Sequence, residues 1–202
     1  TLDGRMITAV DRLETGDGPI PEGVIDLGAQ LLSPAFINAH THLSMGMFRG
    51  LSPPEQLQTN VVETLYFEVE KHLVDADIHA FTRMGAYESL LAGVGCVWDH
   101  YYGKQAVVDA LRETGLCAVF APTLQDQGGP AAERTEDVLD FTLALSQDTR
   151  ANEAGIVAAL GPHATDTVSP ELWARVTELA ERHHLPVHLH LAQSVEELER
   201  SH

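Results

Sequence analysis

Two pairs of histidines fall at the ends of short apolar segments. His40-Thr-His42 follows the apolar run 31–37, and His188-Leu-His190 lies within the apolar segment 186–191. In a β-strand, residues two apart point to the same face, so each pair can present two imidazoles side by side. Neutral imidazole nitrogens bind divalent ions at about 2.0–2.1 Å. The spacing therefore favours a metal site, with unrelated core or surface histidines as the alternative.

A third polar group belongs to the same pattern. His163 stands in Gly161-Pro-His-Ala164, directly after another apolar run at 155–160. Parallel strands end at a common edge, so histidines that follow different strands can meet there. Histidines that share one ion should bring their ring nitrogens within roughly 3–4 Å of one another.

The segments that must position these residues alternate between apolar runs and amphipathic stretches. We predict strands near 34–39, 95–99, 116–121, 155–160 and 186–191. Helices are predicted from a cap at Asp75, over 104–113, around 138–145, after Ser169-Pro-Glu and after Ser194. Strand–helix units in series imply parallel strands, hence an α/β fold. Because the histidines gather at strand C-termini, we predict a (β/α)8 TIM-type barrel, here about its first five units.

The first 33 residues differ from the rest. Glycines punctuate short strand-like pieces at 5–10 and 24–27, which predicts a partial β-sandwich domain over 1–33, followed by barrel residues 34–202. Five parallel strands cannot close an eight-stranded barrel. We therefore expect the N-terminal part of a protein about twice as long.

Composition excludes some partners. The chain has 30 acidic and 12 basic residues and a net charge of −18, which argues against nucleic acid binding. With no signal peptide and no apolar run of membrane-spanning length, we predict a soluble cytoplasmic protein without membrane contacts. A homo-oligomer is compatible with the sequence. Cys96 and Cys117 lack Cys-x-x-Cys spacing and are predicted to be buried free thiols.

Four motifs together resemble the amidohydrolase superfamily: Ser33-Pro-Ala-Phe-Ile-Asn-Ala-His-Thr-His42, Met47-Phe-Arg-Gly50, Gly161-Pro-His-Ala164 and Pro186-Val-His-Leu-His190. They are most similar to its aminohydrolases of purines, pyrimidines, pterins and triazines. The resemblance implies one divalent ion, Zn2+ before Fe2+, held by His40, His42 and His190. It also implies substrate contacts from His163 and, by an approximate match, from Glu70. His188 has no role in this pattern.

The resemblance further implies that metal-activated hydroxide attacks an electron-poor ring carbon while a carboxyl carries a proton to the leaving nitrogen. The family places that glutamate three residues after the last histidine ligand, where this chain has Gln193. An amide cannot exchange protons near neutral pH. The family's further His and Asp would follow on later strands.

We therefore predict a metal-dependent hydrolase that deaminates a heterocycle at a C–N bond. Gln193 leaves open a dechlorinating-type hydrolase, or a catalytically weak or silent homologue that binds a small ligand. A structural zinc site is a further alternative.

Overall fold

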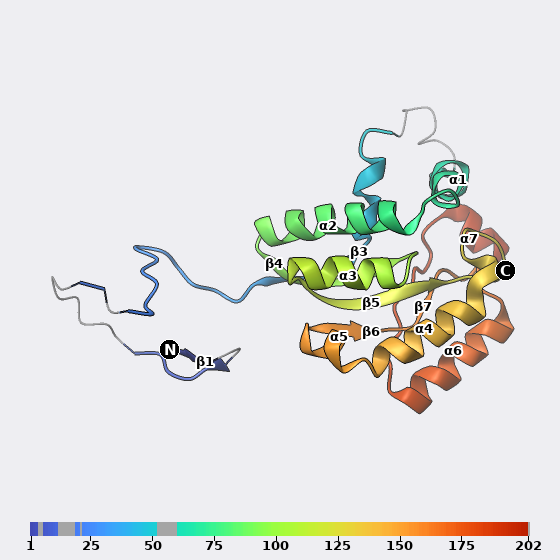
Figure 1. Ribbon diagram of the computed structural model, residues 1–202. Coiled ribbons are helices and arrows are strands. Elements are labelled where there is room, and N and C mark those ends of the chain that lie inside the picture. The colour runs from blue at the N-terminus through green and yellow to red at the C-terminus, as the bar shows by residue number, and fades with distance from the viewer. Residues whose placement is uncertain (4–5, 12–18, 21, 52–59, 202) are drawn as a thin grey trace. The chain divides into compact units, whose positions relative to one another are not determined.

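The computed structural model describes residues 1–3, 6–11, 19–20, 22–51 and 60–201 (Figure 1). These divide into two compact units, Thr1–Pro34 and Ala35–His202. In the first unit, β1 (Leu2–Asp3) pairs antiparallel with β2 (Met6–Ile7). The predicted piece 5–10 therefore contains a two-residue strand, and its Arg5 lies outside the described residues. The piece 24–27 forms no strand, because no described segment supplies its backbone hydrogen bonds. A β-sandwich over 1–33 stays a prediction.

The second unit is built on a parallel sheet. Its order is β3 (Phe36–Thr41), β4 (Val94–Tyr101), β5 (Cys117–Leu124) and β6 (Ile156–Ala158), and β7 (Gly161–Pro162) also pairs with β5. Every neighbouring pair in this sheet is parallel. The predicted α/β fold with parallel strands is confirmed, and the closed eight-stranded barrel stays a prediction.

The predicted fifth strand is present only as an extended segment. Residues 186–191 contain one isolated parallel bridge, between Leu160 and Val187. Backbone hydrogen bonds of 2.9 Å run from Leu160 N–H to Pro186 O and from His188 N–H to Leu160 O. These two bonds place the segment beside the end of β6, although too few bonds form in succession for a regular strand.

Helices lie between most strands of the second unit. They are the 3-10 helices η1 (Leu43–Phe48) and η4 (Ala132–Arg134), the π-helix η3 (Val62–Tyr66), and α1 (Phe67–Glu70), α2 (Asp75–Leu91), α3 (Gln105–Thr114), α4 (Thr135–Ser146), α5 (Thr149–Glu153), α6 (Pro170–His183) and α7 (Val195–Arg200). Within the described ranges, none of these helices is long and apolar enough to cross a membrane.

Local capping explains two of the helix starts. The Ser169 hydroxyl accepts from Leu172 N–H at 3.1 Å, and Ser194 does the same for Glu197 N–H. The expected cap at Asp75 is wrong. Val74 is the N-cap residue of α2, and its N–H donates to the carboxylate of Asp77 at 3.2 Å. Asp77, two residues after the expected cap, therefore accepts the hydrogen bond at the start of α2.

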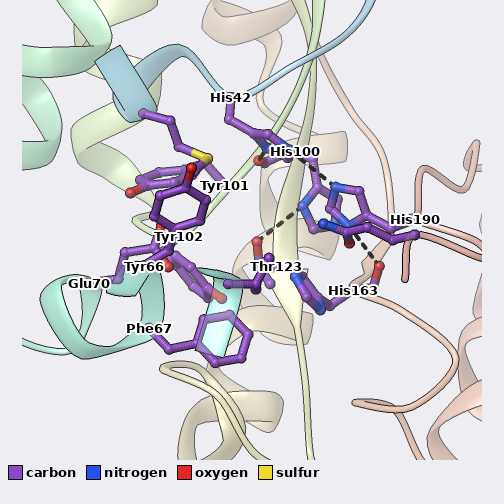
Figure 2. Close-up of a pocket in the computed structure, with 13 residues that line it drawn as sticks. His42, Tyr66, Phe67, Glu70, His100, Tyr101, Tyr102, Thr123, His163 and His190 are labelled. Atoms are coloured by element: carbon purple, nitrogen blue, oxygen red, sulfur yellow. Dashed lines mark hydrogen bonds between the residues drawn. The ribbon is translucent and has the colours of Figure 1, made fainter. Parts of the chain in front are cut away.

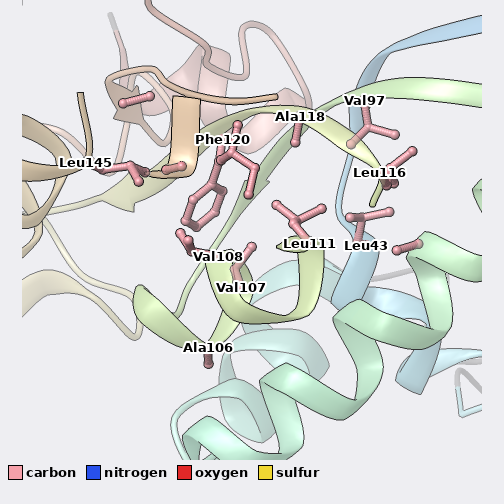
Figure 3. Close-up of a cluster of buried hydrophobic side chains, with 14 of the residues drawn as sticks. Leu43, Val97, Ala106, Val107, Val108, Leu111, Leu116, Ala118, Phe120 and Leu145 are labelled. Carbon is pink, nitrogen blue, oxygen red and sulfur yellow. The ribbon is translucent and has the colours of Figure 1, made fainter. Parts of the chain in front are cut away.

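The core lies between the helices and one face of the sheet (Figure 3). Val107 and Leu111 of α3 pack with Ala118 and Phe120 of β5, and all four are fully or almost fully buried. Burying a side chain the size of Leu111 contributes roughly 1.5–3 kcal/mol. The alternate residues of β4 and β5 face the other way. Among them, Cys96 and Cys117 are free thiols but only half-buried, so the expectation of full burial is wrong.

Close packing fixes the turn that follows the first histidine pair. A Cβ added to Gly85 in α2 would come within 2.4 Å of the Leu43 carbonyl oxygen, so α2 approaches η1 only because this residue is glycine. On the opposite side, the buried Asp99 carboxylate accepts from Leu43 N–H at 2.8 Å. Helix α2 and strand β4 therefore hold the residue that follows His42.

Candidate metal centre

Histidines from four segments meet at the C-terminal edge of the sheet (Figure 2). His40 lies near the end of β3 and His42 directly follows it, while His100 lies near the end of β4. His163 follows β7, and His190 belongs to the extended segment beside it. Parallel strands point their carboxyl ends the same way, which brings residues up to 150 positions apart in sequence into one cluster.

The three predicted ligands come together. His40, His42 and His190 each offer a ring nitrogen, and these nitrogens all lie within 4.8 Å of one another. The Nε2 atoms of His42 and His190 are 3.1 Å apart. Ring centroids are separated by 5.0 Å for His40–His42, 5.0 Å for His40–His190 and 5.1 Å for His42–His190. The ring centroids therefore form a nearly equilateral triangle, and the His42–His190 pair has the predicted nitrogen separation of roughly 3–4 Å.

Backbone carbonyls decide which nitrogen of two of these rings carries the proton. The Nδ1–H of His42 donates to the carbonyl of His100, and the Nδ1–H of His190 donates to the carbonyl of His163 at 2.9 Å. A carbonyl only accepts, so both rings keep a lone pair on Nε2. Two lone pairs facing each other repel, and a cation between them relieves that repulsion. An all-imidazole set of three donors fits Zn2+ or Fe2+.

Burial keeps these histidines neutral. It lowers the pKa of His42 to about 4 and that of His163 to about 3, and neighbouring histidines act in the same direction. Burial also lowers the pKa values of His40 and His190. At neutral pH these rings are therefore uncharged, and a metal ion at the Nε2 atoms of His42 and His190 would not have to displace a proton.

A cavity of about 200 Å³ adjoins the cluster. Histidines form one side of it, and Tyr66, Phe67, Tyr101 and Tyr102 lie on the other side (Figure 2). Met45 and Val62 also line the cavity. Phe67 faces the predicted substrate residue His163 with ring centroids 5.7 Å apart, and the Nδ1 of His163 is 2.9 Å from the Thr167 hydroxyl. A flat apolar ring fits a cavity with such walls.

Glu70, the other predicted substrate residue, lies at the end of α1 and lines this cavity. Its side chain is buried, and burial raises its pKa to about 7, while the Tyr101 hydroxyl acts in the opposite direction. That hydroxyl makes no hydrogen bond of normal geometry within the described part of the chain. The aromatic side of the cavity thus carries one carboxyl that can exchange a proton near neutral pH.

The raised pKa of Glu70 predicts a pH effect on stability. Between about pH 4.5 and pH 7 the folded state binds this proton more tightly than the unfolded state, so stability falls as pH rises through that window. At pH 8 the loss amounts to about 3 kcal/mol. Glu70→Gln should abolish it, making the variant more stable than the parent at pH 8 and equal to it near pH 4.

Urea unfolding at several pH values measures this difference. The control is Glu68→Gln, which changes an exposed residue of the same short helix. Because Lys71 lowers the pKa of Glu68, this variant should not gain stability at pH 8. Parallel stability–pH curves for Glu70→Gln and the parent would show that Glu70 ionises normally.

Gln193 also lines the cavity, and the preceding turn is unusual. Ala192 has φ of 54°, a conformation that residues other than glycine seldom adopt. The buried carboxylate of Glu197 accepts from both Ala192 N–H and Gln193 N–H, and from the Thr165 hydroxyl at 2.6 Å. The Glu197 carboxylate is therefore occupied by hydrogen bonds that stabilise this turn. A proton-shuttle position for Gln193 stays a prediction.

Sequence reasoning missed His100 and Thr123. His100 is fully buried, its Nε2–H donates to Gly161 O at 3.1 Å, and its Nδ1 accepts from the Thr123 hydroxyl at 3.3 Å. The predicted second strand ended at Asp99, whereas β4 continues to Tyr101. A histidine directly after an apolar strand was the available signal, the same one that identified His163.

The chain matches known proteins over most of its length. Residues 31–202 match the model of the Amidohydrolase family. The chain is 30% identical over 200 residues, 98% of its length, to a 5-methylthioadenosine/S-adenosylhomocysteine deaminase of Halobacterium salinarum. It is 31% identical over 98% of its length to a 5'-deoxyadenosine deaminase of Methanothrix thermoacetophila.

Among solved structures, an adenosine deaminase from Xanthomonas campestris with bound zinc has a TM-score of 0.69 at 25% identity, and the match covers 83% of this chain and 38% of that one. The chain spans less than half of the two curated relatives, 46% and 45% of their lengths. Motifs, parallel fold and matches agree: the chain belongs to the amidohydrolase family.

Proposed function

We propose that this chain carries the metal-binding side of a hydrolase that deaminates an adenine-type heterocycle. One observation carries the proposal: ring nitrogens of His40, His42 and His190 lie close together, and His42 and His190, whose Nε2 lone pairs are turned toward each other, line an aromatic cavity. The deaminase names of the relatives support the substrate class.

A divalent ion held by these three histidines, Zn2+ before Fe2+, would lower the pKa of water and supply hydroxide at neutral pH. The side chains of the cavity bind and orient the substrate. The aromatic side of the cavity holds the ring and excludes water, while His163 and Glu70 contact its polar edges. With a pKa of about 7, Glu70 can accept a hydrogen bond as carboxylate or donate one as acid. Gln193 can orient a polar group but cannot carry the proton.

Gln193 also motivates the second candidate. An amide in the cavity is compatible with hydrolytic dechlorination, because chloride leaves as an anion and needs no proton. It is equally compatible with a ligand that binds without turnover. The two functions differ in one measurable respect, because only deamination releases ammonia.

The test is an assay of the zinc-loaded protein on adenosine, 5'-deoxyadenosine, 5'-methylthioadenosine, guanine and a chlorinated triazine. We expect ammonia release from the adenosine group, loss of this activity on chelation and its return with Zn2+. Chloride release from the triazine alone would favour the dechlorinating function. Tight binding without any turnover would identify a silent homologue.

A further inference from the structure

The three proposed ligands are not held equally well. His42 and His190 are half-buried and each donates to a backbone carbonyl. His40 is exposed, and the partner of its Nδ1 is a side chain, His188, whose Nε2 lies 2.7 Å away. The two rings meet edge to face, with centroids 4.7 Å apart and planes at 90°. The least buried ligand thus depends on a second imidazole.

His188 is itself firmly placed. Its side chain is only 8% exposed, and its backbone N–H donates to Leu160 O at 2.9 Å. The Trp98 ring of β4 packs edge-on against it at 5.5 Å, and His100 does so at 5.8 Å. A buried ring on a paired segment makes a rigid support for an exposed one.

In the 2.7 Å contact between His40 Nδ1 and His188 Nε2, either nitrogen can carry the shared proton. The choice decides whether His40 can bind a metal ion. If His188 Nε2–H donates, His40 must carry its own proton on Nε2, which removes the lone pair that would face the ion. If His40 Nδ1–H donates, its Nε2 is free to bind metal, and His188 carries its proton on Nδ1. That Nδ1 is buried and has no partner among the described residues.

We propose that His188 is a positioning residue, which accepts the hydrogen bond from His40 Nδ1 and thereby holds His40 as a metal ligand through Nε2. The inference rests on the proposed metal centre. It gives the second histidine pair two roles: His190 belongs to the ligand set and His188 supports it. The Nδ1 of His188 has no partner in the part of the chain that the structure describes, because the acceptor for His40 is an imidazole, which keeps a proton of its own, and not a carbonyl.

The test compares zinc affinities measured by competition with a chromogenic chelator. Outer-sphere partners of histidine ligands typically change metal affinity 10- to 100-fold, so His188→Leu should weaken zinc binding by roughly that factor. His188→Gln places an amide oxygen near the position of Nε2 and should stay within about 3-fold of the parent. His72→Leu makes the same chemical change at an exposed residue and should bind zinc normally.

Two further measurements separate positioning from packing. The visible spectrum of the Co2+ form should change in His188→Leu and be preserved in His188→Gln. In the zinc-loaded parent, histidine-selective ¹H–¹⁵N spectra should show His188 protonated on Nδ1 and not on Nε2.

Each contrary result has one meaning. Unchanged zinc affinity in His188→Leu, equal losses in both variants, or a proton on His188 Nε2 would overturn the positioning role while leaving the metal centre intact. A parent protein that does not bind zinc would overturn the proposed metal centre itself.

Discussion

Replacing His190 with alanine is expected to remove both tight zinc binding and turnover. The Nε2 of His190 lies 3.1 Å from that of His42, so its loss opens one side of the three-histidine set. Because outer-sphere changes already cost up to about 100-fold in affinity, the loss of a ligand should exceed that. Turnover should fall on the order of 1,000-fold or more, since hydroxide is scarce at neutral pH without a metal to acidify water.

Zinc content by elemental analysis and steady-state kinetics measure the two effects together. His72→Ala is the matched control, because it removes an exposed imidazole far from the ligand positions in sequence. Circular dichroism establishes that His190→Ala is folded. A folded His190→Ala variant with full zinc content and normal turnover would exclude His190 from the ligand set.

The second large effect concerns Gln193. Gln193→Glu is expected to raise the rate of ammonia release from an adenosine-type substrate by about 10- to 100-fold, the lower part of the range for general acid–base catalysis. The physical reason is that a carboxyl partly buried beside a metal site titrates near neutrality and can protonate the leaving nitrogen. The hydrogen bonds that the Ala192 and Gln193 N–H groups donate to the Glu197 carboxylate should keep the turn unchanged.

Comparing an amine with a halide leaving group tests whether the gain in rate comes from proton transfer. A ring halide leaves as an anion and needs no proton, so Gln193→Glu should leave its rate nearly unchanged. Gln147→Glu, the same change at an exposed residue after α4, should alter neither rate. Equal gains on both substrates would place Gln193 away from the shuttle position, and no gain on either would mean that another acid transfers the proton.

Much of the scaffold follows from local sequence. Apolar runs bounded by glycines predicted β3 to β6 with ends that differ by up to three residues, because side-chain alternation and turn residues act over short distances. Ser169-Pro and Ser194 predicted the starts of α6 and α7, since a capping hydroxyl bonds within its own first turn. The two-residue spacing of His40 and His42 likewise placed both rings on one side of a strand.

Other features depended on contacts that no local pattern contains. The acceptors for His42 and His190 are carbonyls at residues 100 and 163, 58 and 27 positions away, so only the packed sheet could select the Nε2 lone pairs. The pKa values of Glu70 and His163 follow from burial, which is a property of the whole cavity.

The second histidine pair shows both what the local sequence determines and what only tertiary contacts determine. The sequence determined that His188 and His190 share a strand-like segment and fall near His40 and His42. The family resemblance assigned His190 to the ligand set and left His188 without a role. Only the tertiary structure decided that His188 lies against His40, with its Nε2 2.7 Å from the Nδ1 of His40. Residues two apart share a face in an extended strand, but which side chains each of them meets depends on how far the segment extends past its neighbours, and that is set by long-range pairing and packing.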